Sequence, residues 1–223
     1  MSVRLDSPFD FQVNYDLPTI SLMLKRRIHE RFTSSDAHWI ETGRLAAERA
    51  HAGQYRGDGS PYAIHPFRVG LLVLDYEQSC TKECLVSSFL HDVVEDTKLT
   101  ELDVTRQFGS VVGNLVAAVT RGRPWNETPA QRRDSKLAKW HQTMEAPRDV
   151  RVIKTFDYCD NLISCKFITP DKPAFAKIPR WLMEGQMLYL PLAERTNTEA
   201  ARLIENELQC YLAAGHKMGS WLD

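Results

Sequence analysis

The run His91-Asp92-Val93-Val94-Glu95-Asp96 places one imidazole and three carboxylates in six consecutive positions, directly after the apolar stretch 84–90. If this run is helical, each residue turns about 100°, and the four side chains fall within an arc of roughly 140°. His91 would then lie above Glu95, and Asp92 above Asp96. Three crowded carboxylates repel one another unless a cation or water relieves them. An imidazole beside a carboxylate supplies half of a divalent-metal site, so the run predicts metal-assisted chemistry.

Two further residues are candidate ligands. His65 stands at the expected start of a helix, where an isolated histidine is more often a core or capping residue than a ligand. Asp157 follows a segment that reads as buried, and an unpaired buried carboxylate is costly. A ligand role would satisfy Asp157, although Arg151 is an alternative partner for it. Together with the pair His91-Asp92, these two residues recur in an order that suggests one site.

At these residues the chain resembles the HD-domain metal phosphohydrolases. Within them it most resembles the alarmone hydrolases, which are the hydrolase half of the RelA/SpoT proteins and their small stand-alone relatives. An HD pair alone is a weak signal, but the run HDVVEDT with an upstream YxxHP is highly specific. The resemblance covers roughly residues 40–165. The matching stretches are HAGQYR (51–56), PYAIHP (61–66), FLHDVVEDT (89–97), FG (108–109), VT (119–120), Asp157 and Asn161.

The resemblance implies a single metal ion, usually manganese in this family, and a mixed imidazole and carboxylate set with open positions suits Mn²⁺. The implied ligands are His65, His91, Asp92 and Asp157. Glu95 and Asp96 match the family's catalytic acidic pair, which orients or deprotonates the attacking water. The positions implied to bind the nucleotide are Arg56, Asn161 and, as a contact or a frame, Tyr62. The implied reaction is hydrolysis of the 3′-diphosphate of (p)ppGpp to pyrophosphate and GDP or GTP.

Two stretches depart from the family pattern. Gly57 follows Arg56 where the family usually has a lysine, and Tyr158-Cys159-Asp160 lacks the basic residues that usually flank this point. Fewer cations around the pocket keep two other functions open. One is an HD-fold phosphohydrolase that acts on another nucleotide, such as an adenosine alarmone. The other is a non-catalytic regulator that binds an alarmone, although pure binding requires neither the full ligand set nor the acidic pair.

A basic-rich stretch follows the motif-bearing region. It consists of Arg121, Arg123, Arg132, Arg133, Lys136 and Lys139. The default interpretation of such a stretch is a solvated helix face. The alternative is a rim that steers phosphates over the metal, which gains interest from the glycine at position 57. The region of Trp181, Met183 and Met187 is more typical of a core or a dimer contact than of a ligand site.

Composition bounds the remaining classes. A length of 223 residues suits one domain, and a formal net charge of −1 does not indicate attraction to nucleic acid or to a membrane surface. No stretch approaches the roughly 18 apolar residues of a membrane span. Five cysteines without a CxxC pair favour reduced thiols, so we expect a cytoplasmic protein. Its partner is expected to be a small nucleotide, and a homo-oligomer remains an option.

The pattern of apolar residues predicts an all-α, HD-domain helical bundle. Helical spacing is present over 20–32, from 35 to 51, from His65 onward, over 112–119 and over 131–144. Thr100 with Asp103 predicts a capping-box start, whereas the β-branched run 150–153 is compatible with a strand or a buried helix. We expect one HD-type hydrolase domain over 1–223, with a motif-bearing core at about 40–165. Residues 170–223 would be a C-terminal helical extension, in which the Pro-bearing stretch 170–179 is compatible with a linker.

Overall fold

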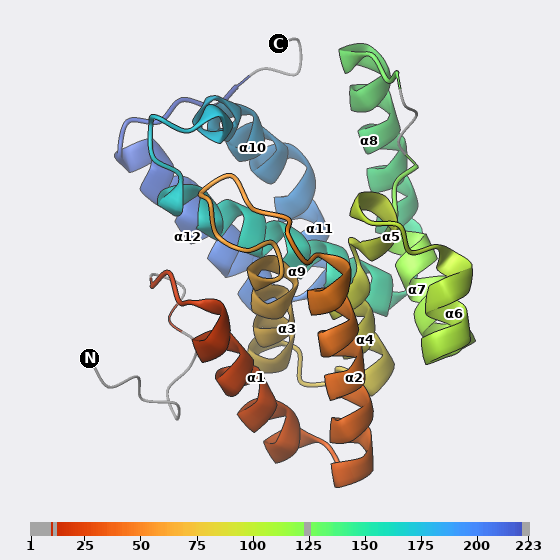
Figure 1. Ribbon diagram of the computed structural model, residues 1–223. Helices are drawn as coiled ribbons and strands as arrows, with labels where there is room; N and C mark the ends of the chain where they lie inside the picture. Colours follow the sequence, from red (N-terminus) through yellow and green to blue (C-terminus); the bar gives the residue numbers. More distant parts are fainter. Residues whose placement is uncertain (1–9, 11–12, 123–125, 220–223) are drawn as a thin grey trace.

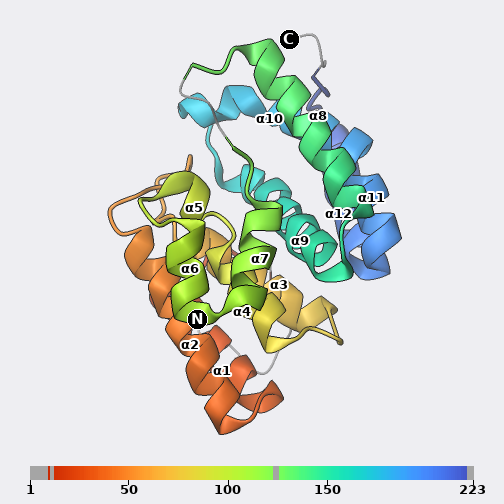
Figure 2. The ribbon, with the colours of Figure 1, turned by 90° about the vertical axis from the view of Figure 1, so that its right-hand side faces the viewer.

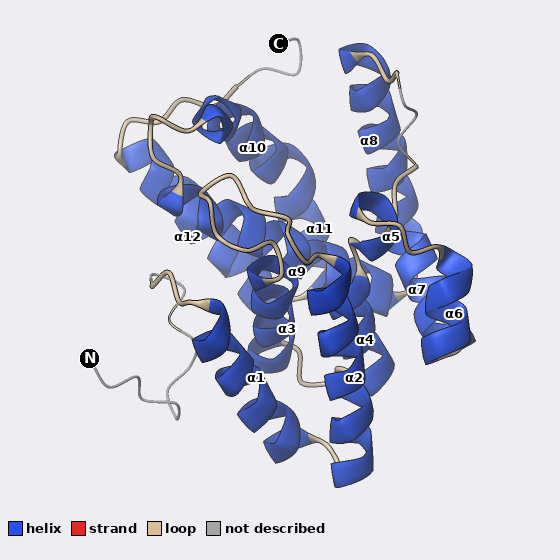
Figure 3. Cartoon of the chain, viewed as in Figure 1, coloured by secondary structure: helices blue, strands red, loops and turns tan. Residues whose placement is uncertain are grey.

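The chain is helical throughout the part that the computed structural model describes, which is residues 10, 13–122 and 126–219. Twelve α-helices occur in these residues, together with three short helical turns and no strand (Figure 3). In the described residues, Tyr55 and Pro61 form an isolated antiparallel β-bridge. The predicted all-α bundle is therefore confirmed. Arg123 of the basic-rich stretch lies outside the described residues.

Four helices build the first half of the bundle. They are α1 (Leu17–Arg31), α2 (Ser34–Ala50), α3 (Ile64–Tyr76) and α4 (Lys82–Leu90). Helix α3 packs against α1 and α4, and α2 packs against α4 (Figure 1). Every residue of α3 from Ile64 to Leu74 is buried, so this helix lies inside the bundle rather than on its surface.

Helix α9 (Arg148–Ser164) runs through the middle of the molecule (Figure 1). It packs against α3, α4 and α7 on one side and against α11 and α12 on the other. The β-branched run 150–153 belongs to this helix, and Val150, Val152 and Ile153 are all buried. Because neighbours surround α9, it is buried around much of its circumference, which is why periodicity alone could not separate helix from strand in the run 150–153.

The HD run itself is not one continuous helix, so the predicted stacking of His91 on Glu95 is wrong. Helix α4 ends at Leu90, and the four-residue helix α5 (Val93–Asp96) begins after a break at His91-Asp92. The His91 side chain supports this break, because its Nδ1 lies 2.8 Å from the carbonyl oxygen of Ser88. His91 Nε2 faces His65 Nε2, whereas Glu95 accepts from the backbone N–H of Arg121 and Asp96 accepts from Tyr62.

The helices α6 (Glu101–Phe108) and α7 (Ser110–Val119) form a short hairpin beside α4. The predicted capping box is present, since the Thr100 hydroxyl accepts from Asp103 N while the Asp103 carboxylate accepts from Thr100 N. Gly109 joins the two helices with φ of 87°, a left-handed conformation that favours glycine.

The second half of the chain packs on the other side of α9. Helix α8 (Pro129–Glu145) lies away from α1 to α4 in both ribbon views (Figure 1, Figure 2). The later elements are the 3₁₀ turns η1 (Cys165–Phe167) and η2 (Pro173–Lys177), α10 (Ile178–Glu184), the π-helical turn η3 (Gly185–Tyr189), α11 (Leu190–Thr196) and α12 (Thr198–Ala213). The stretch 170–179 is not an extended linker, because it forms η2 and begins α10, with Ile178 buried.

The contact between α3 and α4 offers a test of the bundle, because this contact positions His65 and His91. A Cβ added at Gly70 of α3 would overlap the buried Phe89 ring of α4. Gly70→Ala should lower the free energy of unfolding by about 1–3 kcal/mol, the usual cost of overpacking. Gly122→Ala is the matched control, since nothing lies within 4 Å of its added Cβ. Urea denaturation measures both, and equal midpoints for the two variants would contradict the packing argument.

Candidate metal centre and adjoining cavities

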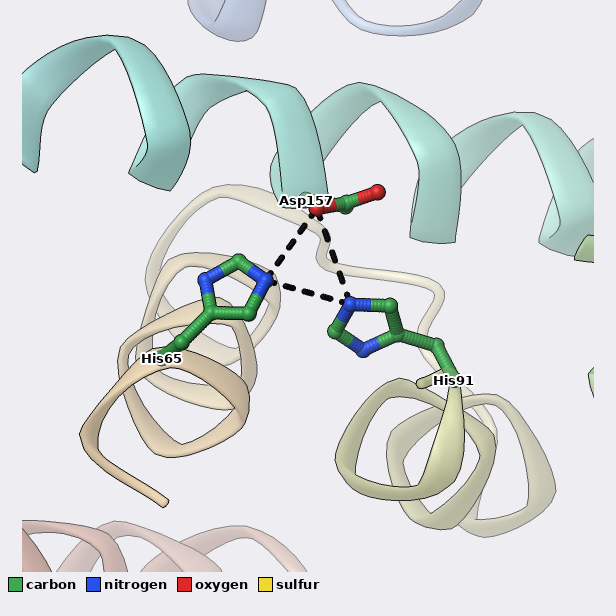
Figure 4. Close-up of side chains that lie close together, drawn as sticks. All are labelled: His65, His91 and Asp157. Atoms are coloured by element: carbon green, nitrogen blue, oxygen red, sulfur yellow. Dashed lines mark hydrogen bonds and ion pairs between the residues drawn. The ribbon is translucent and has the colours of Figure 1, made fainter. Parts of the chain in front are cut away.

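Three helices that are far apart in sequence bring two imidazoles and a carboxylate together. His65 lies in the first turn of α3, His91 directly follows α4, and Asp157 lies in the middle of α9 (Figure 4). All three side chains are buried. Packing of α9 across α3 and α4 creates this meeting point, and nothing in the local sequence around any one residue would require it.

The distances suit one shared cation. The Nε2 atoms of His65 and His91 are 3.2 Å apart, and Asp157 Oδ1 lies 3.2 Å from the first and 3.6 Å from the second. These ligand atoms all lie within 4.8 Å of one another. Asp92 falls outside that tight cluster, yet its Oδ2 is 3.6 Å from His65 Nε2 and 3.2 Å from His91 Nε2. Ligands bonded at about 2.1 Å to one divalent ion lie about 3 Å apart when they are neighbours.

The hydrogen bonds on the far side of each ring indicate which nitrogen carries a proton. His65 Nδ1 is 2.7 Å from Asp160 Oδ2, and His91 Nδ1 is 2.8 Å from Ser88 O. Both partners are acceptors, so each Nδ1 donates and each neutral Nε2 is left with a lone pair. Two lone pairs and two carboxylates that face one space repel one another. A cation bound between them would be attracted to all four groups and would remove this repulsion. The His65, His91 and Asp157 cluster therefore fits a divalent metal.

The electrostatics of the centre favour a positive charge at its middle. Burial disfavours an imidazolium, but the carboxylates of Asp92 and Asp157 nevertheless raise the pKa of His91 well above its usual value. Burial would also raise the pKa of Asp157, yet Lys154 and His91 hold it well below its usual value. Lys154 Nζ donates to Asp157 Oδ2 at 2.6 Å, which leaves Oδ1 facing the imidazoles.

Asp160 is the functional residue that the sequence analysis missed, because it was seen only as a departure from the family pattern. Its side chain is fully buried, where it accepts from Arg68 Nε and lies 3.4 Å from Arg56 Nη1. Burial alone would raise the pKa of Asp160, but Arg68, His65 and Arg56 keep it well below its usual value. The available signal was Arg68, an arginine inside the apolar α3, since a buried charge requires a partner.

The two predicted catalytic acids are held by different groups. Tyr62 Oη lies 2.6 Å from Asp92 Oδ2 and 3.0 Å from Asp96 Oδ2, so its hydroxyl ties a candidate ligand to one member of the acidic pair. Glu95 Oε1 instead accepts from the backbone N–H of Arg121 at 2.6 Å. The Tyr62 ring is stacked on His51, with centroids 4.5 Å apart. The structure thus places Tyr62 as a support for the acids as well as a wall of the site.

A cavity of about 280 Å³ adjoins the candidate metal centre. The acids that line it are Asp92, Glu95, Asp96, Asp157 and Glu184. The cations that line it, called the basic wall below, are Arg121, Arg132, Lys136, Lys139, Lys154, Lys177 and Arg180. Four residues of the basic-rich stretch thus face the cavity, whereas Arg133 does not line it, so the stretch is more than a solvated face. Lys154 pairs with Asp157 and Lys136 with Glu184, but the cations outnumber the acids, which suits a polyphosphate that approaches a metal site.

A second cavity, of about 240 Å³, lies beside the first. Its lining includes Tyr55, Arg56, Ile168 and Ala174, and four residues line both cavities: Tyr62, Asn161, Lys177 and Trp181. Arg56 Nη2 donates to Asn161 Oδ1 at 3.4 Å, and Asn161 Nδ2 donates to Asp157 Oδ1 at 2.7 Å. The residues predicted to bind the nucleotide thus stand at the junction of the cavities. Trp181, expected in a core or dimer contact, forms a wall of both.

The Asp160 contact yields a prediction about the metal centre. Asp160→Asn keeps the side-chain shape but weakens the acceptor that fixes the tautomer of His65. Metal affinity should fall about 10–100-fold, as is usual when such a supporting carboxylate is lost. Titration with Mn²⁺ or Co²⁺ measures this, and circular dichroism checks the fold. Asp134→Asn, on the exposed face of α8, is the control. Unchanged metal affinity in Asp160→Asn would contradict the role of Asp160 in orienting His65.

The raised pKa of His91 predicts how metal affinity depends on pH. Below that pKa a proton occupies the centre, so a metal ion must displace it, and binding releases the proton. Affinity should therefore fall as the pH is lowered, by about tenfold per pH unit for one displaced proton. Calorimetry in buffers of different ionisation enthalpy counts the released protons. A metal affinity that stays constant between pH 6 and pH 9, with no proton release, would contradict this picture.

None of the described helices has both the length and the apolar character that crossing a membrane requires. The five cysteines are free thiols, four of them buried.

Comparison with known proteins places this geometry in context. A Myxococcus xanthus protein named GTP pyrophosphokinase is 30% identical over 194 residues, which is 85% of this chain and 24% of that protein. The Escherichia coli protein named bifunctional (p)ppGpp synthase/hydrolase SpoT is 34% identical over 157 residues, covering 68% of this chain and 21% of that one. The chain thus spans about a quarter of the length of the curated relatives that it matches.

A solved structure described by the words "A metazoan ortholog of SpoT hydrolyzes ppGpp and plays a role in starvation responses" has the same fold. Its TM-score is 0.68 at 21% identity, and the match covers 80% of this chain and 97% of that one. The family model described as HD domain matches residues 44–199, a range that contains all of the candidate ligands. The helical bundle, the clustered histidines and aspartate, and this match agree: the chain belongs to the HD domain family.

Proposed function

We propose that this protein is a Mn²⁺-dependent hydrolase that removes the 3′-diphosphate of guanosine alarmones, converting (p)ppGpp to GDP or GTP and pyrophosphate. The observation that carries the proposal is the convergence of the His65 and His91 lone pairs with Asp157 beside a cavity with a basic wall. The names of the curated relatives support the same activity. We treat 1–223 as one HD-type unit acting in the cytoplasm, where its free thiols would stay reduced.

The two joined cavities suit the parts of such a substrate. The 3′-diphosphate would lie beside the candidate metal centre, facing Lys136 and Lys139 of α8. The base would enter the second cavity, where Tyr55 and Trp181 offer aromatic faces and Arg56 offers a guanidinium plane. Bases stack on both kinds of surface. Asn161, at the junction, would contact the ribose or the base.

The ion would be held by His65, His91, Asp92 and Asp157. When bound, it supplies positive charge beside the phosphoryl oxygens and lowers the pKa of an adjacent water. Asp160 and Ser88 keep the Nδ1 protons in place, so the Nε2 atoms face the ion. Mn²⁺ suits this mixed imidazole and carboxylate set.

Glu95 and Asp96 would orient and deprotonate the attacking water. A water molecule attacks the phosphorus next to the 3′ oxygen, a new P–O bond forms, and the bond from phosphorus to the 3′ oxygen breaks. Glu95 or Asp96 takes one proton of the water and returns it to the 3′ oxygen as the bond to phosphorus breaks. The hydroxyl of Tyr62 orients Asp96, while the backbone N–H of Arg121 orients Glu95. The basic wall neutralises the departing diphosphate.

Product analysis tests the proposed reaction. Metal-loaded protein is incubated with guanosine and adenosine alarmones, and the guanosine alarmone should yield pyrophosphate and GDP or GTP, identified by mass spectrometry. Release from the adenosine alarmone alone would replace the guanosine assignment. Orthophosphate without pyrophosphate would indicate a different phosphohydrolase. Tight nucleotide binding without turnover in saturating Mn²⁺ would indicate a binding regulator instead.

Substitutions separate the ligands from the acidic pair. His65→Ala and Asp92→Ala should lose metal content and turnover together. Glu95→Gln should keep the metal but lower kcat by about 10²–10⁴-fold, the usual contribution of a general base. Metal analysis of each purified variant, alongside its kcat, provides the measurement. Full activity in metal-stripped protein would falsify the mechanism.

A further inference from the structure

Gly57 marks a place where two distant segments touch. A Cβ added there would lie 2.6 Å from the Cβ of Ala174 and 3.8 Å from Ile168 Cδ1. The backbone of Gly57 does not have a positive φ, so conformation does not require glycine at this position. The requirement is space, because η2 is seated directly against the loop that carries Arg56. The residue that interrupts the family pattern therefore has a structural reason in this chain.

The segment seated on Gly57 ends at Lys177. Lys177 is exposed and lines both cavities, and it is the cation among the four residues that they share. The other shared polar groups already have partners, since Tyr62 bonds to Asp92 and Asp96 while Asn161 bonds to Asp157. In the described part of the chain, no hydrogen bond or ion pair engages the Lys177 ammonium. By contrast, Lys136 on the basic wall is 2.6 Å from Glu184.

We propose that Lys177 binds the 5′-phosphates of the nucleotide and that the contact between Gly57 and Ala174 positions it. This inference rests on the proposed function. A ribose with its 3′-diphosphate at the metal centre and its base in the second cavity directs its 5′ substituent to the junction between them. A lysine there is a point charge that suits a phosphate without requiring one fixed geometry. Ala174 leaves no room for a side chain at position 57, so Lys177 supplies a cation in place of the lysine that the family pattern has there.

Kinetics with two substrates tests the binding role. Lys177→Gln should raise KM for guanosine 3′,5′-bis(diphosphate) by about tenfold, a moderate value for one exposed charge-assisted contact, with little change in kcat. The same variant should leave KM unchanged for guanosine 3′-diphosphate, which lacks the 5′-phosphates. Lys172→Gln is the matched control, since Lys172 precedes the same turn but lines neither cavity. Equal effects on both substrates, or none on either, would overturn the assignment.

A pair of substitutions tests the positioning contact. Gly57→Ala forces the turn away from the loop, so it should reproduce the KM defect of Lys177→Gln. Ala174→Gly removes the opposing methyl group, so the double variant Gly57→Ala with Ala174→Gly should restore KM. Circular dichroism confirms that each variant folds. A normal KM in Gly57→Ala, or a folded double variant that is not rescued, would refute the positioning role.

A binding measurement separates failure of this inference from failure of the proposed function. GDP carries only 5′-phosphates, so its affinity for the full-length protein reports on Lys177 without any turnover. Equilibrium binding of GDP should weaken about tenfold in Lys177→Gln and stay unchanged in Lys172→Gln. If the wild-type protein releases no pyrophosphate but GDP binding depends on Lys177, only the hydrolase proposal fails. If pyrophosphate is released but the affinity for GDP is the same in Lys177→Gln as in the wild-type protein, only the inference about Lys177 fails.

Discussion

The arrangement of this molecule depends on two imidazole nitrogens, His65 Nε2 and His91 Nε2, that face each other at 3.2 Å. When both rings are neutral and their Nδ1 protons are held by Asp160 and Ser88, neither Nε2 has a proton to donate to the other. A positive charge between the rings, either a proton on His91 or a bound cation, stabilises this close approach, and Asp157 and Asp92 add negative charge to the same space. The fold therefore brings together groups that repel one another unless a cation joins them.

Helix α9 supplies the common support for this centre. It carries Asp157, Asp160 and Asn161 within two turns, so one rigid element holds a ligand, the group that orients His65, and the residue at the cavity junction. The neighbours of α9 then surround one cavity with charges of both signs. Glu95 and Asp96 come from α5, and three cations come from α8, while Lys154 is paired with Asp157 on α9 itself. Because the cations that line the cavity outnumber the acids, a polyanionic ligand can approach the acidic groups without crossing a uniformly negative surface.

Much of the fold and part of the site could be predicted from the sequence. Helical periodicity, the capping box at Thr100 and the order of the motif residues were informative because each depends on neighbours in the chain. The continuous helix expected through His91 was wrong, since the side-chain contact of His91 with Ser88 O accompanies a break that periodicity does not register. The interpretation of Asp160 as a lost basic residue was incomplete, because its partner Arg68 lies more than ninety positions away in the chain.

The sequence by itself determined the helical class and the types of ligand, because side-chain chemistry and helical spacing are local properties. Only the tertiary structure decided which of these groups meet. It placed three candidate ligand atoms, from α3, from the residue that follows α4 and from α9, within 4.8 Å of one another. It also seated η2 on Gly57, which carries Lys177 to the edge of both cavities. These contacts result from the packing of buried helix faces against one another. Such packing brings together residues that are far apart in the chain, and their separation in the sequence does not indicate their distance in space.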